Sequence, residues 1–294
     1  MACGGGLARQ EWAGEASATI ESGDSNVQPE PARVTIQEGV LIDTIDGREL
    51  RYDIYTPPGG GRNAPGVLLI HGGAWLQGDP SQLRGYGIFL GRLGYVCVSA
   101  AYRLSGEAKW PAQIHDVKAA LRWMRANADT LGVDPARIAV HGNSAGAHLA
   151  LMLAGTPNVP EFEGAGVHPG VDTSVSACVA IYAPTLLAMR SLSDAIGQLM
   201  GPGASAEDYR AASPVTYARK EFPPTMLVHG MKDEVVPWAA SAQMHEALEK
   251  TGATVDLHLF SGMPHAFDAD SAYSRTIAGL IDLFLRRNVA AGGR

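Results

Sequence analysis

Apolar and polar residues alternate in the first part of the sequence, and further on the apolar residues gather into short runs. The alternation over residues 33–56 contains the turn-forming pair Asp46-Gly47, which predicts an antiparallel hairpin. The run at 67–70 is apolar throughout, which predicts a strand buried on both faces inside a parallel sheet. Further strands are predicted at 96–100, 138–140, 179–182, 226–228 and 255–260.

Helical patterns stand between these predicted strands. Apolar residues recur on one side of the segment 111–128, which predicts an amphipathic helix, and further helices are predicted at 147–154, 238–250 and 274–287. The pair Asp134-Pro135 predicts a turn. This order of elements predicts an α/β fold in which a doubly wound, mostly parallel sheet has helices on both faces. The stretch 184–217 fits the alternation poorly, and we expect an insertion there, above the carboxyl ends of the strands.

The composition is that of a soluble globular protein, with 46% hydrophobic and 18% charged residues among 294. A net charge of -7 offers no basic surface for phosphate backbones, so we expect no nucleic-acid partner. No apolar run is long enough for a membrane span. Residues 1–31 lack the basic and apolar regions of a signal peptide, so we expect a cytoplasmic protein whose first 31 residues are flexible or form part of a cap.

The three cysteines form no close pair, which argues against a disulfide framework and against a thiolate metal site. Cys97 and Cys178 lie inside apolar runs, where cysteine packs as a small core residue.

A glycine-flanked serine follows the predicted strand at 138–140 and precedes a predicted helix. In Gly142-Asn143-Ser144-Ala145-Gly146 the small residues permit a sharp turn that lifts the serine hydroxyl above the sheet, so Ser144 is a candidate nucleophile. Taken alone, the same five residues also fit an ordinary strand-to-helix turn with a buried serine.

A second glycine motif, His71-Gly72-Gly73, follows the predicted strand at 67–70. Acyl transfer needs N–H donors for the oxyanion of the tetrahedral intermediate, and glycines let main-chain N–H groups approach a substrate closely. We therefore assign an oxyanion hole to the N–H groups of Gly72, Gly73 and Ala145. A plain turn at the end of a strand is the alternative.

A serine nucleophile needs a base and a residue that orients the base, in the order serine, acid, histidine. Asp233 follows the predicted strand at 226–228, with Glu234 as its competitor, and His265 follows the last predicted strand. The other eight histidines lie within strands, on predicted helices, before other motifs or in an irregular loop, so the loop position favours His265. We predict the triad Ser144, His265 and Asp233.

Over residues 35–285 the chain resembles the α/β-hydrolase esterases with a His-Gly-Gly oxyanion motif. These include a hormone-sensitive-lipase-like branch and a bacterial acetylxylan and feruloyl esterase-like branch. The resemblance is carried by His71-Gly72-Gly73-Ala74-Trp75, Tyr102-Arg103-Leu104, Gly142-Asn143-Ser144-Ala145-Gly146, Asp233 and His265. Ala74 stands where the first branch has a third glycine, and Asn143 where it has an aspartate. The His-Gly-Gly-x-Trp form is more like the second branch and also occurs in kynurenine formamidases.

The resemblance implies an eight-stranded, mostly parallel sheet with helices on both faces, a hydrolase domain over 32–294 and a small cap inserted at about 185–217. It implies a serine carboxylic-ester hydrolase for short-chain acyl esters that needs no metal or organic cofactor. An amide hydrolase of the kynurenine formamidase or acyl-peptide hydrolase type, and a non-catalytic binding protein of the same fold, stay open as alternatives. We expect a small-molecule ester as the partner and leave a homodimer open. Trp75, Tyr182 and Trp238 are candidates for lining the substrate pocket.

Overall fold

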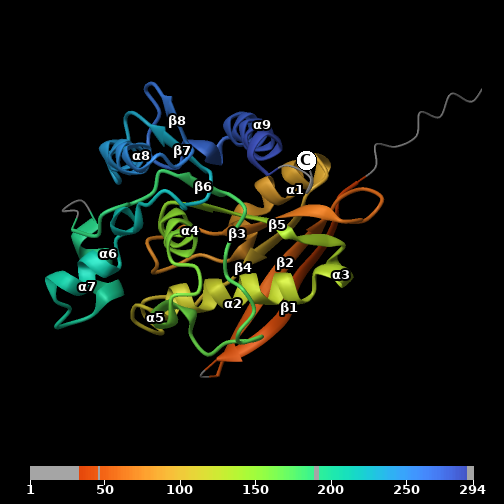
Figure 1. The fold of residues 1–294 in the computed structure, drawn as a ribbon, viewed down its shortest axis with the longest axis horizontal. Coiled ribbons are helices and arrows are strands. Elements are labelled where there is room, and N and C mark those ends of the chain that lie inside the picture. The colour runs from red at the N-terminus through yellow and green to blue at the C-terminus, as the bar shows by residue number, and fades with distance from the viewer. Residues whose placement is uncertain (1–32, 46, 189–191, 290–294) are drawn as a thin grey trace, which may run out of the picture. The chain divides into compact units, whose positions relative to one another are not determined.

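The computed structural model describes residues 33–45, 47–188 and 192–289, so the expectations for residues 1–31 lie outside the described residues. Eight strands form one sheet in the order β1-β2-β4-β3-β5-β6-β7-β8 (Figure 1). Their bounds are β1 Thr35–Ile45, β2 Arg48–Thr56, β3 Ala64–Ile70, β4 Val96–Ala100, β5 Val133–Asn143, β6 Cys178–Ile181, β7 Thr225–Gly230 and β8 Val255–Phe260. β1 and β2 form the predicted antiparallel hairpin, β2 is also antiparallel to β4, and β3 to β8 are parallel.

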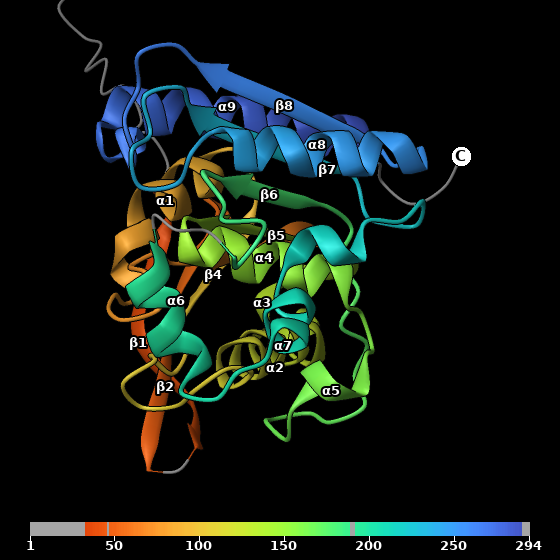
Figure 2. The same ribbon diagram turned by 90° about the vertical axis from the view of Figure 1, so that its left-hand side faces the viewer.

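Helices cover the sheet on both faces, as two separate clusters of buried apolar side chains show. Helices α1 and α9 lie on one face of the sheet and α2, α4 and α8 on the other (Figure 2). The buried side chains of α1 and α9 belong to one cluster, and those of α2, α4 and α8 belong to the other. The helices are α1 Arg84–Arg92, α2 Ala112–Ala126, α3 Ala128–Leu131, α4 Ala145–Gly155, α5 Pro160–Glu163, α6 Ser193–Met200, α7 Ala206–Ala211, α8 Ala239–Thr251 and α9 Ser271–Asn288, with the 3-10 turns η1 Pro80–Leu83, η3 Pro214–Tyr217 and η4 Phe267–Ala269. Every described helix is too short or too polar to cross a membrane.

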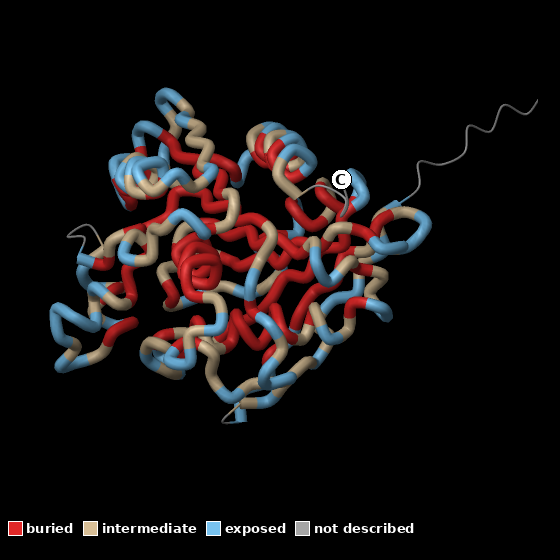
Figure 3. The backbone as a smooth tube through the Cα atoms, viewed as in Figure 1, coloured by how far each residue is buried: buried red, intermediate tan, exposed pale blue. Residues whose placement is uncertain are grey.

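The centre of the sheet is the most deeply buried part. β4, β6 and β7 are buried at every residue, and so is the whole of α4, which follows β5 (Figure 3). Cys97 and Cys178 are free and buried there, and burial raises the pKa of both thiols. Because the carboxyl ends of β3 to β8 lie at one edge of this sheet, residues that follow these strands are brought together.

The strand predicted at 138–140 begins earlier, at Val133, so the predicted turn at Asp134-Pro135 lies inside β5. The N–H of Ala136 donates to Asp134 Oδ1 at 3.0 Å there, and the pairing with β3 is irregular between Ala64 and Gly66. The extra residues of β5 are therefore accommodated as an irregularity inside the strand, and the regular ladder resumes at Ile138.

The segment between β6 and β7 contains α6, α7 and η3. A capping box begins α7: the Ser205 hydroxyl accepts from the N–H of Asp208, whose carboxylate accepts from the N–H of Ser205. The irregular sequence pattern of this stretch thus corresponds to short helices where the parallel strands would otherwise continue.

Candidate active site

A strained turn joins β5 to α4 and carries Ser144. This residue has φ 54° and ψ -118°, a backbone conformation that non-glycine residues rarely adopt. Its N–H donates to the carbonyl oxygen of Ile181 at 2.9 Å, which fixes the turn against β6. A Cβ on Gly146 would clash with the carbonyl oxygen of Ile70, and one on Gly142 would clash with that of Gly146. The glycines are therefore required by close backbone contacts as the strand turns into the helix.

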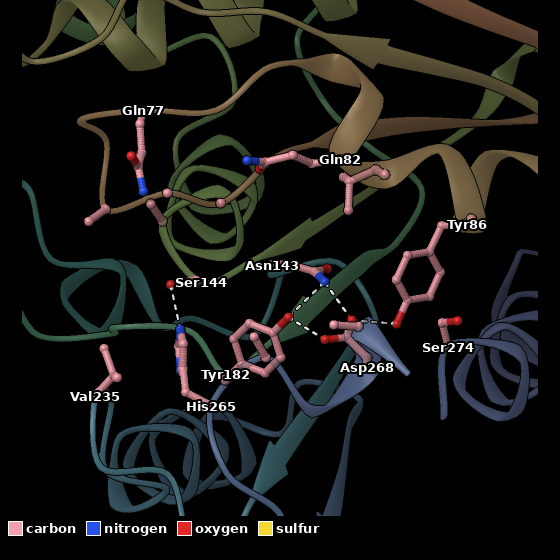
Figure 4. Close-up of a pocket in the computed structure, with 18 of the residues that line it drawn as sticks. Gln77, Gln82, Tyr86, Asn143, Ser144, Tyr182, Val235, His265, Asp268 and Ser274 are labelled. Carbon is pink, nitrogen blue, oxygen red and sulfur yellow. Dashed lines mark hydrogen bonds between the residues drawn. The ribbon is translucent and has the colours of Figure 1, made fainter. Parts of the chain in front are cut away.

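Ser144, His265 and Asp233 form one hydrogen-bonded chain at the carboxyl ends of β5, β8 and β7. Ser144 Oγ lies 3.1 Å from His265 Nε2, and His265 Nδ1 lies 2.7 Å from Asp233 Oδ2. Figure 4 marks the bond between Ser144 and His265 with a dashed line. With the ring proton on Nδ1, the histidine donates to the carboxylate and leaves Nε2 free to accept from the serine hydroxyl. The structure therefore brings together the three predicted residues. The competitor Glu234 is exposed.

Hydrogen bonds hold the Asp233 carboxylate in its ionised form. Burial acts to raise the pKa of this carboxyl, but hydrogen bonds from His229, His265 and the N–H of Val236 outweigh it and hold the pKa well below its ordinary value. The N–H groups of Val235 and Val236 donate to Oδ1 at 2.9 and 2.8 Å, and His229 Nε2 lies 3.2 Å from Oδ2. His229 was not predicted from the sequence to contact the acid, although its place four residues before Asp233 at the end of β7 was a signal.

The His71-Gly72-Gly73 segment lies directly opposite the turn at Ser144. A Cβ on Gly72 would approach the carbonyl oxygen of Asn143 to 3.0 Å, and Gly73 has φ 107°. Among the described residues, the N–H groups of Gly72 and Gly73 donate no hydrogen bond. Both glycines line the same pocket as Ser144 and Ala145, the first residue of α4, so their N–H groups are candidate donors for an oxyanion beside Ser144.

A pocket of about 620 Å³ contains these groups. Its lining includes Trp75 and Tyr182 as predicted, but Trp238 is not among its lining residues and has 37% of its surface exposed. Trp75 is fully buried, and its indole N–H donates to His148 Nδ1 at 3.3 Å. The other lining residues are Gly72, Gly73, Ala74, Gln77, Gln82, Leu83, Gly85, Tyr86, Phe89, Asn143, Ser144, Ala145, Pro184, Leu192, Val235, His265, Ala266, Asp268, Ala269, Ser271 and Ser274.

Asp268, which lies three residues after His265 and lines this pocket, was not predicted from the sequence. Its carboxylate accepts hydrogen bonds from Tyr86, Tyr182 and Asn143 (Figure 4). Within the described part of the chain, no group of three or more metal-ligating side chains could hold an ion.

This arrangement can activate a hydroxyl for attack on a carbonyl group. The base lies within hydrogen-bond reach of the serine, a carboxylate orients the base, and two glycines whose N–H groups donate to no described residue line the same pocket.

Comparisons with known proteins find a matching family model and similar esterases. The BD-FAE family model matches residues 52–248. Among curated proteins, the chain is 35% identical to esterase LipQ and 33% identical to esterase LipC, both from Mycobacterium tuberculosis, over 81% of its own length in each case. These matches cover 59% and 60% of the two relatives, so the chain spans about three fifths of their length.

Solved structures of esterases share the fold. A truncated form of a carbohydrate esterase from gut microbiota superposes with a TM-score of 0.77 at 27% identity, over 87% of this chain and 98% of that one. The apo form of Thermogutta terrifontis esterase 2 superposes with a TM-score of 0.73 at 27% identity, over 92% of this chain and 100% of that one.

Proposed function

Since the chain belongs to the BD-FAE family and has the α/β-hydrolase fold, we propose that it is a serine carboxylic-ester hydrolase for short-chain acyl esters. The observation that carries the proposal is the chain of hydrogen bonds from Ser144 Oγ through His265 to Asp233, with distances of 3.1 and 2.7 Å. The names of the similar proteins, esterases in each reported case, agree with it.

In the proposed reaction Ser144 Oγ attacks the ester carbonyl carbon while His265 Nε2 takes the hydroxyl proton. The tetrahedral intermediate collapses, the bond from carbon to the alcohol oxygen breaks, and His265 returns its proton to the departing alcohol. A water molecule then attacks the acyl-enzyme as His265 takes one of its protons, and collapse releases the carboxylic acid and restores Ser144. Asp233 holds the imidazole tautomer and stabilises the imidazolium in both halves.

The N–H groups of Gly72, Gly73 and Ala145 are the proposed donors to the oxyanion. Their support is the unused N–H groups of the two glycines and the position of Ala145 at the amino end of α4, where the helix dipole favours negative charge. Removing one such donor costs on the order of 3 kcal/mol of transition-state stabilisation in serine hydrolases.

For the organisation of the protein, we propose one hydrolase domain over 32–294 with a cap at about 185–217. Pro184 and Leu192, at the start of the segment that follows β6, line the pocket, which supports a role for this segment in enclosing the substrate. The substrate is taken to be a small-molecule ester, for which a pocket of about 620 Å³ has room. The homodimer and the cytoplasmic location stay predictions.

The test compares wild type with Ser144→Ala on p-nitrophenyl acetate and on N-formylkynurenine. We expect hydrolysis of the ester by wild type and a loss of at least about 10⁴-fold in kcat for Ser144→Ala, because the triad acts as a unit. Ser81→Ala, which removes an exposed serine outside the pocket, is the matched control. Full turnover by Ser144→Ala would refute the assignment, and faster cleavage of the formamide than of the ester would move it to amide hydrolysis.

A further inference from the structure

Asp268 is a buried carboxylate that joins side chains from three other parts of the fold. It lies in η4, has 7% of its surface exposed, and accepts from Tyr86 Oη of α1 at 2.8 Å. It also accepts from Tyr182 Oη, just after β6, at 2.5 Å and from Asn143 Nδ2, at the end of β5, at 2.6 Å. Figure 4 shows the three bonds converging on the one carboxylate.

Neutral donors, and no cation, satisfy this carboxylate. No Lys or Arg is among the residues that line the pocket, and within the described residues the bonds to the Asp268 carboxylate come from Tyr86, Tyr182 and Asn143. Burial first, and then the charge of Asp268, raise the pKa of Tyr86 and Tyr182 well above the ordinary value, so both hydroxyls keep their protons and act as donors. A buried carboxylate with three donors is held rigidly, because each lost donor would leave a desolvated acceptor.

The partners of Asp268 are the immediate neighbours of the proposed triad. Asn143 directly precedes Ser144, and the ring of Tyr182 packs against the ring of His265 with centroids 4.6 Å apart and an angle of 57° between the planes. On the other side of His265 the loop is held by the N–H of Lys232, which donates to the carbonyl oxygen of Met263 at 2.8 Å. The side of the loop that follows His265 is held to the neighbouring elements by the bonds of Asp268.

We propose that Asp268 is a positioning residue, which fixes the His265 loop against the turn that carries Ser144 and so maintains the contact between Nε2 and Oγ. This inference rests on the proposed ester hydrolysis. Asp268 takes no part in the chemistry and acts through Asn143 and Tyr182. A misplacement of about 1 Å in a catalytic contact lowers rates by about 10²-fold, so a loosened loop reduces turnover much more than it reduces substrate binding.

The first experiment is Asp268→Asn, which keeps the size of the side chain and places an amide N–H₂ group where the structure has an acceptor. We expect kcat on p-nitrophenyl acetate to fall by about 10- to 100-fold with KM within about threefold of wild type. Labelling of Ser144 by a fluorophosphonate should slow by a similar factor.

The matched control is Asp282→Asn. Asp282, in α9, also accepts a hydrogen bond from a tyrosine, Tyr95 Oη, at 3.0 Å, but it pairs with Arg286 and does not line the pocket. Its loss should leave kcat and the labelling rate within about twofold of wild type.

The second experiment exchanges the two polar side chains in the double variant Asn143→Asp with Asp268→Asn. The amide then lies at position 268 and donates to a carboxylate at 143, which restores the bond in the opposite direction. We expect the exchange to recover at least about tenfold in kcat over Asp268→Asn, whereas Asn143→Asp alone, which places two carboxylates in contact, should be the least active of the three.

Three results would overturn the inference: folded Asp268→Asn with wild-type kcat, a rise in KM at unchanged kcat, or no recovery in the folded double variant. If Asp268→Asn does not fold, Tyr182→Phe, which keeps the ring but removes the bond to Asp268, must lower kcat by itself, and wild-type turnover there would overturn the inference equally. Failure of the proposed function looks different, because wild type itself would then show no hydrolysis that depends on Ser144.

Discussion

Three fully or almost fully buried histidines predict that the folded protein loses stability in mild acid. Burial lowers the pKa of His71 and His148 from 6.5 to about 4 and that of His141 from 6.5 to about 3. The contacts of His148 favour the neutral ring. Its Nδ1 accepts from the indole N–H of Trp75, and its Nε2 lies 2.8 Å from the carbonyl oxygen of Ala212. A second ring proton on His148 would face the Trp75 N–H group, so the neutral form is the one that fits.

The sign and size of the effect follow from proton linkage. Below pH 6.5 the unfolded chain binds protons at these three residues while the folded protein does not, so the free energy of unfolding falls as the pH falls. Between pH 7 and pH 5 each residue contributes a loss of roughly 2 kcal/mol, or about 6 kcal/mol for the three together. The loss continues until the pH reaches the folded-state pKa values, and it is comparable to the whole stability of many domains.

Urea unfolding at pH 7, 6 and 5 measures this loss. With an m-value of about 3 kcal/mol/M, the midpoint should fall by roughly 2 M between pH 7 and pH 5. His141→Phe replaces one of the three buried imidazoles with a ring that cannot bind a proton, and should reduce the dependence by about a third. His168→Gln, which removes an exposed histidine, is the control and should leave it unchanged. A midpoint that stays constant from pH 7 to pH 5 would show that these rings do not hold their neutral form in the folded protein.

The sequence predicted the interior of the sheet well because burial on both faces leaves a direct signature. Strands β3, β4, β6 and β7 each correspond to a mostly apolar run, whereas the edge strand β8 shows alternating apolar and polar residues, and the order of the strands along the chain placed the candidate residues at one edge. Chain order also identified Ser144, Asp233 and His265, since each follows a strand whose end is visible in the sequence.

Helix α1 was not predicted, because three glycines in nine residues argue against a helix. Two of these glycines are there for packing. A Cβ on Gly87 would lie 2.6 Å from the ring of Tyr55, and one on Gly91 would lie 2.9 Å from a methyl group of Val34. Close contact with the sheet and with the preceding segment therefore outweighs the low helix propensity, and such contacts are not visible in the sequence.

The hydrogen bonds of Asp268 next to the triad could not be predicted from the sequence either. Asp268 meets Tyr86 and Asn143 across separations of 182 and 125 residues, and no local pattern encodes such pairs. Trp238 was a candidate for lining the pocket, but it lies at the start of α8 and is not among the residues that line the pocket. The direction of a side chain at the start of a helix depends on how the helix packs.

Two further substitutions test the proposed triad and its turn. Asp233→Asn should lower kcat by about 10⁴-fold, because an amide facing Nδ1 favours the tautomer whose Nε2–H cannot accept from Ser144, whereas Glu234→Gln, at the exposed neighbour, should stay within about twofold. Gly146→Ala should leave little active enzyme, because its Cβ would clash with the carbonyl oxygen of Ile70 at the end of β3 and must displace either that strand or the turn. Gly197→Ala, at a helical glycine with open space around its Cβ position, provides the control for the effect of alanine itself. Equal fluorophosphonate labelling of Gly146→Ala and Gly197→Ala would mean that the turn tolerates a Cβ, and the close contact with β3 would then not be what holds Ser144 in place.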